Sequence, residues 1–237
     1  MSARPEHSAL LYERRDDLQG SDSLSEIARR VGPGSTVLDL GAATGALGRR
    51  LREAGCTVDG VEHDAQAAAQ ARPFYRRLLE LDLDRADLRE QFPHAAYDVV
   101  VCADVLEHLR DPAGALATLR RALAREGQVV ISMPNVAHLW MRLSLLAGRF
   151  EYAERGILDR THLRFYTRRT LTALVRGAGL RIARLTSTPV PLYQLVPTRW
   201  HGRALAAVHA LSAHTARALP RLLAYQFVVG ATHDRER

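Results

Sequence analysis

The chain has 237 residues, of which 33 are basic, and its net charge is +7. All the basic residues are arginines, and the lack of lysine excludes Schiff-base and lysine-base catalysis. The length and a hydrophobic content of 47% are sufficient for one α/β domain with a sizeable core. No apolar run is long enough to span a bilayer, and residues 1–20 contain no signal-peptide core. Cys56 and Cys102 are expected to be buried thiols, which favours a cytoplasmic location.

The charge is unevenly distributed along the chain. Residues 1–110 contain 14 arginines and 19 acidic residues, which is a balance of −5. Residues 111–237 contain 19 arginines and 7 acidic residues, which is a balance of +12. Such a basic half is compatible with solvated helix faces. It is equally compatible with an anionic partner, such as a phosphate-bearing substrate, a nucleic acid or a membrane surface.

Short β-rich apolar runs alternate with helical segments in the first part of the chain. This alternation predicts a parallel sheet with crossover helices. The predicted strands are 36–40, 57–61, 77–81, 97–102 and 128–133. The predicted helices between them are 46–54, 63–71 and 112–125, the last of them ended by Gly127.

After Pro134 the pattern changes. The predicted elements are helices 138–150, 168–178 and 203–219 and strands 180–186 and 225–232. We therefore predict one domain over 1–237, with a helical cap at 1–30 and acceptor-side insertions at 135–167 and 188–222. The apolar helix 138–150 is interpreted as a lid or a dimer face rather than a membrane anchor. His209 and His214 stand alone in an alanine-rich helix and are expected to face solvent.

The strongest motif is a glycine loop that follows the first strand, within Val37–Gly48. Gly41 and Gly45 would let the backbone approach a ligand closely, because they lack a Cβ atom. In an open parallel sheet, the ligand crevice lies at the carboxyl end of the first strand. The spacing G-x-x-x-G-x-x-G differs from the G-x-G-x-x-G fingerprint of nicotinamide-dependent enzymes.

Acidic residues end the strands around this loop. Asp39 precedes the loop, and a carboxylate there suits a cationic ligand better than a pyrophosphate. Glu62 ends the second strand, where an acid can accept both ribose hydroxyls of an adenosine. Asp82 ends the third strand and could accept the adenine amino group, while Leu83 packs on the ring. The ligand predicted from these residues contains ribose and positive charge but no phosphate.

Asp39–Gly45 resembles motif I of the class I S-adenosylmethionine-dependent methyltransferases, with Ala43 in place of the usual middle glycine. The resemblance covers roughly residues 25–187 and 224–232. It implies a Rossmann-like α/β fold: a seven-stranded, mostly parallel sheet with helices on both faces. In that sheet the last strand, here 225–232, runs antiparallel between the fifth and the sixth. The cofactor would be S-adenosyl-L-methionine, bound by Asp39, Gly41, Gly45, Glu62, Asp82, Leu83 and Asp104.

A second cluster follows the fourth strand. If a helix begins at Asp104, then Asp104, Glu107 and His108 share one of its faces and could ligate a divalent metal such as Mg²⁺ or Mn²⁺. The segment resembles the E-x-x-E-H of ubiquinone-pathway O-methyltransferases and of small-RNA 2′-O-methyltransferases, where it holds a metal. The commoner alternative is that Asp104 faces the donor or the acceptor while Glu107 and His108 brace the loops over the site. His108 is also a candidate general base.

The third cluster lies late in the chain, at Asp159-Arg160-Thr161-His162-Leu163-Arg164-Phe165-Tyr166-Thr167. It resembles a D-x-T-H-x-R-F-[FY]-[ST] segment of bacterial methyltransferases that act on small molecules. His162 could take a proton from an acceptor hydroxyl, and Arg160 and Arg164 could bind a phosphate or carboxylate. Alternatively, Asp159, Thr161 and His162 form a turn that caps the next helix. Asn135 could contact the acceptor or simply form a turn.

Together these features predict a small-molecule O-methyltransferase whose acceptor is a sugar or natural-product intermediate, in one version a phosphate-bearing one. His162 and His108 are the candidate bases. The alternatives are N-methylation of a small molecule and metal-assisted 2′-O-methylation of RNA. The RNA alternative is weakened because the basic half lacks an evident platform for base stacking. A homodimer and a non-catalytic binding subunit are further hypotheses.

Overall fold

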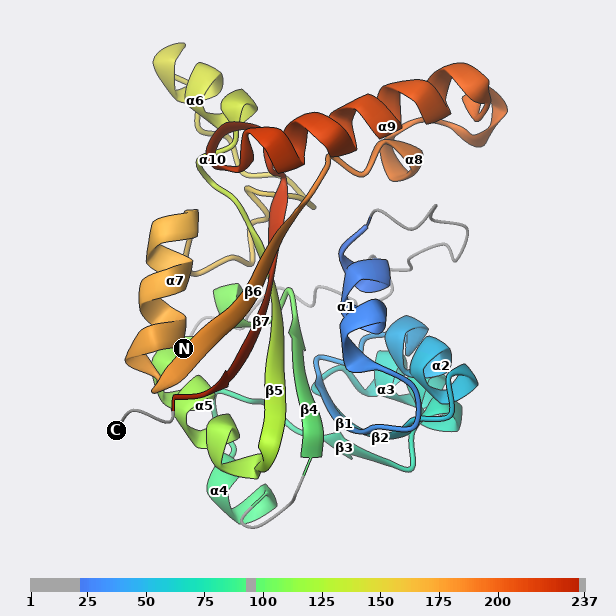
Figure 1. Ribbon diagram of the computed structural model, residues 1–237, viewed down its shortest axis with the longest axis vertical. Helices are drawn as coiled ribbons and strands as arrows, with labels where there is room; N and C mark the ends of the chain where they lie inside the picture. Colours follow the sequence, from blue (N-terminus) through green and yellow to red (C-terminus); the bar gives the residue numbers. More distant parts are fainter. Residues whose placement is uncertain (1–21, 93–96, 235–237) are drawn as a thin grey trace.

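The computed structural model describes residues 22–92 and 97–234, which form one seven-stranded sheet in the order β3-β2-β1-β4-β5-β7-β6 (Figure 1). β1 to β5 are parallel, and β7 runs antiparallel between β5 and β6. The predicted sheet and the position of its last strand are therefore confirmed. The strands are β1 Thr36–Leu40, β2 Thr57–Glu62, β3 Arg77–Glu80, β4 Tyr97–Ala103, β5 Leu123–Pro134, β6 Leu180–Thr188 and β7 Gln226–His233.

Helices cover both faces of the sheet (Figure 1). On one face lie α1 Ser23–Val31, α2 Ala46–Glu53 and α3 Ala65–Ala71, followed by the 3₁₀ turn η2 Arg72–Phe74. On the other face lie α4 Leu88–Gln91, α5 Pro112–Leu119 and α7 Arg168–Gly177. Of the cap expected at 1–30, α1 belongs to the described residues, and residues 1–21 lie outside them.

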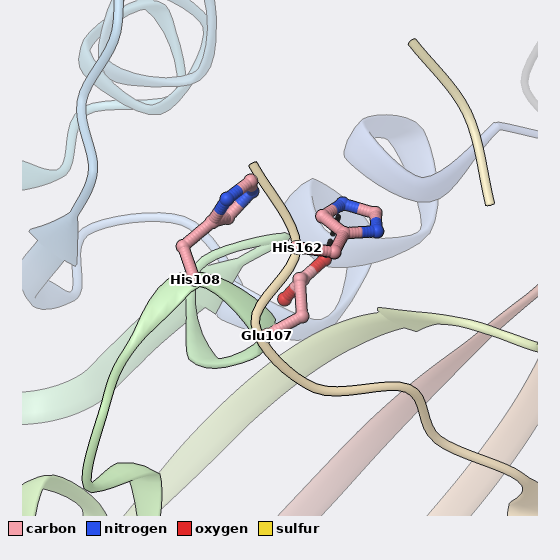
Figure 2. A group of neighbouring side chains, drawn as sticks. All are labelled: Glu107, His108 and His162. Atoms are coloured by element: carbon pink, nitrogen blue, oxygen red, sulfur yellow. Dashed lines mark ion pairs between the residues drawn. The ribbon is translucent and has the colours of Figure 1, made fainter. Parts of the chain in front are cut away.

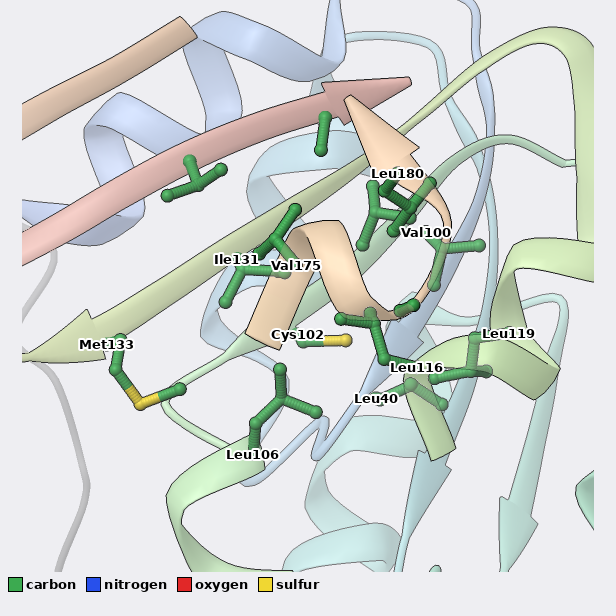
Figure 3. Close-up of a cluster of buried hydrophobic side chains, with 14 of the residues drawn as sticks. Leu40, Val100, Cys102, Leu106, Leu116, Leu119, Ile131, Met133, Val175 and Leu180 are labelled. Carbon is green, nitrogen blue, oxygen red and sulfur yellow. The ribbon is translucent and has the colours of Figure 1, made fainter. Parts of the chain in front are cut away.

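Alternation along the strands builds a core on each face. In β1, Val37 belongs to the cluster under α1 to α3, while Leu38 and Leu40 belong to the cluster under α5 and α7. The larger cluster packs strand residues such as Ile131 against helix residues such as Val175 (Figure 3). Because successive side chains of a strand point to opposite faces, Asp39 shares the face of Val37 and lies under α2 and α3.

The fifth strand begins earlier than the sequence pattern predicts. Instead of a helix to residue 125, α5 ends at Leu119, a 3₁₀ turn η4 covers Arg120–Ala122, and β5 starts at Leu123. Gly127 therefore does not end a helix. It lies in β5 beside an irregularity in the pairing with β4, where a Cβ atom would be 2.9 Å from the carbonyl oxygen of Tyr97. The missing side chain lets the two strands close up at this bulge.

The late segments form a group of helices beyond the carboxyl end of β5 (Figure 1). α6 Leu139–Leu146 follows β5, and the excursion between β6 and β7 contains α8 Leu192–Leu195, η5 Thr198–Trp200, α9 Arg203–Ala218 and α10 Pro220–Leu223. His214 is exposed as expected, but the expectation for His209 is wrong. α9 buries His209 with Ala213 and Ala216, and the imidazole packs edge-on against the ring of Tyr193. Among the described residues, no helix is long and apolar enough to cross a membrane.

Candidate functional site

The glycine loop joins β1 to α2 through three residues with left-handed backbone, Gly41, Ala43 and Gly45, and Ala43 has φ +47°. Gly41 has φ +71° and Gly45 has φ +86°, and Gly45 caps the amino end of α2. A Cβ atom on Gly41 would lie 2.6 Å from Val105, and one on Gly45 would lie 2.8 Å from the Cα of Ala71. Both positions therefore require glycine for conformation and for space.

The third glycine of the motif has a different role. A Cβ atom on Gly48 would lie 2.4 Å from the ring of Tyr75, and one on Gly60 of β2 would lie 2.7 Å from the same ring. The two glycines leave a slot for Tyr75, whose hydroxyl donates a 2.6 Å hydrogen bond to Oδ2 of Asp39. The sequence pattern did not indicate this contact. Tyr75 follows a proline turn, and nothing in that turn marks it as the partner of Asp39.

Asp39 is a buried carboxylate at the carboxyl end of β1. Burial raises its pKa to about 7, although the hydrogen bond from Tyr75 acts in the opposite direction and Glu62 adds a smaller upward effect. Its second oxygen, Oδ1, is buried without a hydrogen-bond partner among the described residues. A cation that reached this carboxylate would stabilise its ionised form.

Glu62 ends β2 and ties the glycine loop to the next turn. Its carboxylate accepts hydrogen bonds from the amides of Ala43, His63 and Asp64, at 2.8 to 2.9 Å. Nδ1 of His63 lies 3.0 Å away. Burial alone would raise the pKa of Glu62, but these hydrogen bonds outweigh it and the pKa is lowered. The side chain is therefore held ionised beside the loop.

Asp82 and Leu83 follow β3 at the same edge of the sheet. Oδ1 of Asp82 accepts the amide of Asp84 at 2.9 Å, and its carboxylate lies 3.5 Å from the guanidinium of Arg85. Leu83 packs partly buried against the main core cluster. Both residues are partly exposed.

Asp104 lies directly after β4, in a conformation that is uncommon for a residue with a side chain. Its φ is +56°, and its Oδ1 accepts hydrogen bonds from Ser132 at 2.6 Å and from Gln226 at 3.0 Å. Neighbouring strands thus hold the strained backbone in place, a pattern often found at functional sites. The helix expected to begin at Asp104 is absent. A short 3₁₀ turn, η3 Leu106–His108, forms instead.

This change alters the composition of the second cluster. Glu107, His108 and His162 each offer one donor atom, and these atoms lie within 4.8 Å of one another (Figure 2). Asp104, which the expected helix would have placed on their face, is not part of the group. Glu107 is 1% exposed, Oε1 of Glu107 lies 4.0 Å from Nε2 of His162, and the two imidazole centroids are 4.8 Å apart.

Backbone contacts bring the late histidine segment onto this turn. The amides of Leu163 and Arg164 both donate to the carbonyl oxygen of Glu107, at 2.9 and 3.1 Å. The amide of Val136, just after β5, donates to the carbonyl oxygen of Tyr166 at 2.9 Å. The segment is thus fixed between η3 and the end of β5, which places His162 over Glu107.

Hydrogen bonds assign the protonated nitrogen of each imidazole. The hydroxyl of Thr161 donates to Oδ1 of Asp159 at 2.7 Å, so its oxygen is left to accept from Nδ1 of His108 at 3.1 Å. Nδ1 of His162 lies 3.1 Å from the carbonyl oxygen of Ile157 and donates to it. In the neutral rings, both Nε2 atoms therefore carry a lone pair.

Burial keeps both imidazoles neutral. It lowers the pKa of His108 to about 4, with a further contribution from His162, and it also lowers the pKa of His162. A buried carboxylate and two imidazole lone pairs thus lie together. Such a group can accept a proton from a bound molecule, and it can also ligate a divalent metal.

A small cavity adjoins the cluster, and in this structure it is too narrow to admit a water molecule. It is lined by Glu107, Met133, Pro134, Val136, Ile157, His162, Arg164, Phe165 and Tyr166. Arg164 and Arg160 are both exposed: the guanidinium of Arg164 donates to the carbonyl oxygen of Arg110, and Arg160 is paired with Glu154.

Of the two alternatives for Asn135, the structure favours the turn: its side chain is buried, donates to the carbonyl oxygen of Ala224 at 2.8 Å, accepts from the amide of Ala137 and does not line the cavity. Asp159 and Thr161 do form a turn, but Thr167, not this turn, caps α7.

Comparisons with known proteins agree with this geometry. Residues 12–185 match a family model described as a methyltransferase domain. The chain is 30% identical over 168 residues to a ubiquinone biosynthesis O-methyltransferase of Aromatoleum aromaticum. This alignment covers 68% of this chain and 71% of the relative. It is 31% identical over 160 residues to the enzyme of the same name from Pseudomonas paraeruginosa, over 63% of this chain and 66% of that one.

Solved structures share the fold at lower identity. A SAM-dependent methyltransferase from Archaeoglobus fulgidus superposes with a TM-score of 0.61 at 17% identity, over 94% of this chain and 98% of the other. Magnesium protoporphyrin IX methyltransferase from Synechocystis, with bound SAH, has a TM-score of 0.58 at 17% identity, over 89% and 82% of the two chains. The strand order, the glycine loop and these matches agree, and the chain belongs to the class I S-adenosylmethionine-dependent methyltransferases.

Proposed function

We propose that this methyltransferase acts on a hydroxyl group of a small molecule bound beside Glu107 and His162. The observation that carries the proposal is the buried group of one carboxylate and two neutral imidazoles at the wall of the acceptor-side cavity. A hydroxyl must lose its proton as its oxygen attacks the methyl carbon, whereas an amine needs no such base. This group supplies a place for that proton.

We assign His162 as the base and Glu107 as its partner. Nε2 of His162 carries the lone pair, because Nδ1 is bonded to the carbonyl oxygen of Ile157. Proton transfer to Nε2 would create an imidazolium 4.0 Å from the carboxylate of Glu107, which would stabilise it. His108 does not line the cavity. It would influence the proton transfer only through its contacts with Glu107 and His162.

The assignment of residues that bind the methyl donor rests on the glycine loop and the acidic residues at the strand ends. We assign the glycine loop at Gly41 and Gly45, together with Asp39 and Asp104, to the methionine part of the donor. We assign Glu62 to the ribose hydroxyls. Asp82 and Leu83 would contact the adenine. Glu62→Ala should therefore weaken S-adenosylhomocysteine binding about tenfold or more in calorimetry, since a carboxylate to hydroxyl hydrogen bond contributes about 1.5–3 kcal/mol.

The residues that line the cavity limit which acceptor molecules would fit it. Phe165, Tyr166, Ile157 and Val136 favour an apolar or aromatic body, and Arg164 could bind a phosphate or carboxylate on it. The names of the relatives, ubiquinone biosynthesis O-methyltransferases, support oxygen as the accepting atom. We therefore propose a natural-product or sugar intermediate that carries a free hydroxyl and an anionic group.

His162→Ala tests the base. Turnover should fall by about 100-fold or more, because a positioned general base contributes about 10²–10⁴-fold, while S-adenosylhomocysteine binding should stay unchanged. His214→Ala, which removes an exposed imidazole on α9, is the matched control and should retain full activity. If His162→Ala kept wild-type turnover, the base assignment would fail and an amine acceptor would be favoured.

A divalent metal is a second candidate for the same group, favoured by the clustering of Glu107, His108 and His162. Both imidazoles donate Nδ1–H to backbone or side-chain oxygens, as metal-ligating histidines usually do. Calorimetry with Mn²⁺ and the visible spectrum of a Co²⁺ complex would test it. Binding to the wild type that is lost in Glu107→Gln, together with loss of activity in EDTA, would establish a metal-assisted reaction. No binding and full activity in EDTA would exclude it.

A further inference from the structure

The exposed apolar side chains are concentrated in one part of the chain. All the large hydrophobic residues that are exposed in the described structure lie between positions 140 and 219. The preceding residues, which build most of the sheet, contribute none. A soluble domain normally scatters such residues singly over its surface, so this concentration marks an interaction surface.

Two helical segments carry the most exposed of these side chains. In α6, Trp140 is 70% and Leu146 is 86% exposed, and Met141 is the buried residue of the helix. Near α9, Trp200 is 67% and Leu211 is 64% exposed. The guanidinium of Arg142 on α6 donates to the carbonyl oxygen of Arg221 on α10 at 3.2 Å, so α6 and the α8–α10 excursion are linked. Figure 1 shows them together at the end of the molecule beyond the carboxyl end of β5.

The charged side chains of these two segments themselves have one sign. The sequence contains no aspartate or glutamate from Arg160 to His233, a stretch with eleven arginines, and none in 127–150. Exposed arginines stand among the apolar residues on the two segments. They are Arg142, Arg149, Arg199, Arg203, Arg217 and Arg221. Alternation of apolar side chains with unopposed arginines is typical of helices that lie in the interface of an anionic bilayer.

We propose that the surface formed by α6 and α8–α10 docks on a membrane that contains anionic phospholipids. The apolar side chains would enter the boundary between headgroups and acyl chains, and the arginines would contact lipid phosphates. A second copy of this chain fits the surface less well, because a two-fold contact would place arginines against arginines without a carboxylate to pair them. This inference does not depend on the identity of the methyl acceptor.

The docking face adjoins the candidate site. α6 starts three residues after Val136, which lines the cavity, and its cap residue His138 packs against Tyr225, the residue before the last strand. The proposed docking face and the cavity are thus adjacent along the chain at Val136. A membrane-borne acceptor is the substrate class that such a placement suits.

Vesicle sedimentation with the full chain tests the proposal. The protein should bind vesicles of equimolar phosphatidylcholine and phosphatidylglycerol at least about tenfold more tightly than vesicles of phosphatidylcholine alone, and added salt should weaken the binding. The double variant Arg203→Gln/Arg217→Gln should lose about tenfold in binding. The matched variant Arg89→Gln/Arg125→Gln removes the same number of exposed arginines elsewhere and should bind like the wild type.

The apolar contribution needs a separate variant. Trp140→Ser/Leu146→Ser should reduce vesicle binding strongly while S-adenosylhomocysteine binding, measured by calorimetry, remains unchanged and so reports an intact fold. Equal losses in both arginine pairs, or no preference for anionic vesicles, would overturn the proposal. A dimer in sedimentation velocity that Trp140→Ser/Leu146→Ser dissociates would also overturn it, since a second copy would then cover the surface.

Discussion

At the scale of single residues, Thr161 links a buried acid to an imidazole. Its hydroxyl proton is directed to Asp159, so its oxygen accepts Nδ1–H of His108 and leaves the lone pair on Nε2. Thr161→Val keeps the shape and removes this link. We expect the Nδ1–H form of His108 to lose population in ¹⁵N NMR spectra of the imidazole, and turnover to fall about 10-fold to 100-fold.

Thr161→Ser is the control for that experiment. Serine retains the hydroxyl, so both the imidazole spectrum and the turnover should return close to wild type. A spectrum that Thr161→Val leaves unchanged would show that the carbonyl oxygen of residue 161, 3.3 Å from the same nitrogen, orients His108 by itself.

The pKa of Asp39 predicts how stability depends on pH. Burial raises it to about 7, well above the value of an unfolded aspartate, so the folded chain binds an extra proton between these two values. The contribution to stability is complete below about pH 4 and is lost as pH rises through about 7. Asp39 should therefore contribute a decrease in the free energy of unfolding across this window, measured in urea without cofactor, opposite in sign to the increase contributed by the lowered pKa of His108.

Asp39→Asn removes the titrating group, so the free energy of unfolding of this variant should fall less, or rise more, with pH than that of the wild type. Tyr75→Phe removes the hydrogen bond that favours the ionised carboxylate, so the decrease should extend to higher pH. A wild-type profile that rises between pH 4 and 7 and does not change in Asp39→Asn would contradict the assignment.

The acids at the strand ends could be located from the sequence, because a strand pattern shows where each strand ends and parallel strands end at one edge. Glu62 and Asp104 were placed in this way. The partners of these acids could not be located. Tyr75 reaches Asp39 through a slot between two glycines, and His162 reaches Glu107 through backbone pairing of distant segments. Such contacts follow from tertiary packing and have no local signal.

At the scale of elements, α2 packs on Tyr75 through a glycine. Gly48→Ala would place a Cβ atom 2.4 Å from the ring and push the hydroxyl away from Asp39. We expect a loss of about 1–3 kcal/mol in the free energy of unfolding, as for other overpacked core positions, and weaker donor binding. Gly177→Ala is the control: this glycine ends α7, and no atom lies within 4 Å of its Cβ position.

The two substitutions add the same methyl group to a helix, so helix propensity alone would make both neutral or stabilising by up to about 1 kcal/mol. A loss confined to Gly48→Ala in urea unfolding would therefore measure the slot for Tyr75. Equal stability of both variants would show that Tyr75 can move without cost.

Elements with a repeating pattern were predictable and those set by pairing were not. The strands of the parallel part and the antiparallel last strand follow from apolar runs and from the family resemblance. The early start of β5 and the 3₁₀ turn after Asp104 could not be predicted from either. In both places backbone pairing with a neighbouring strand or segment overrides the helix that the side-chain pattern favours.

At the scale of the whole molecule, the excursion between β6 and β7 is separable from the core. The two strands pair from Leu180 and His233 at one end to Thr188 and Gln226 at the other. The amide of Tyr225 also donates to the carbonyl oxygen of Thr188 at 2.9 Å, so the pairing is closed on both sides of the excursion. None of the largest fully buried side chains comes from within it.

Replacement of residues 190–223 by Asn-Gly should therefore leave a folded methyltransferase. Pro189 and Ala224 would remain, and a tight hairpin of the type that Asn-Gly favours would join the strands. The loss of the small buried stripe around His209 should cost about 2 kcal/mol of unfolding free energy, less than the stability of a typical domain. S-adenosylhomocysteine binding should persist in calorimetry, while anionic vesicles should no longer sediment the protein. A shortened chain that failed to fold would show that α9 belongs to the core of the domain. One that folded and still bound vesicles would place the membrane contact on α6 alone.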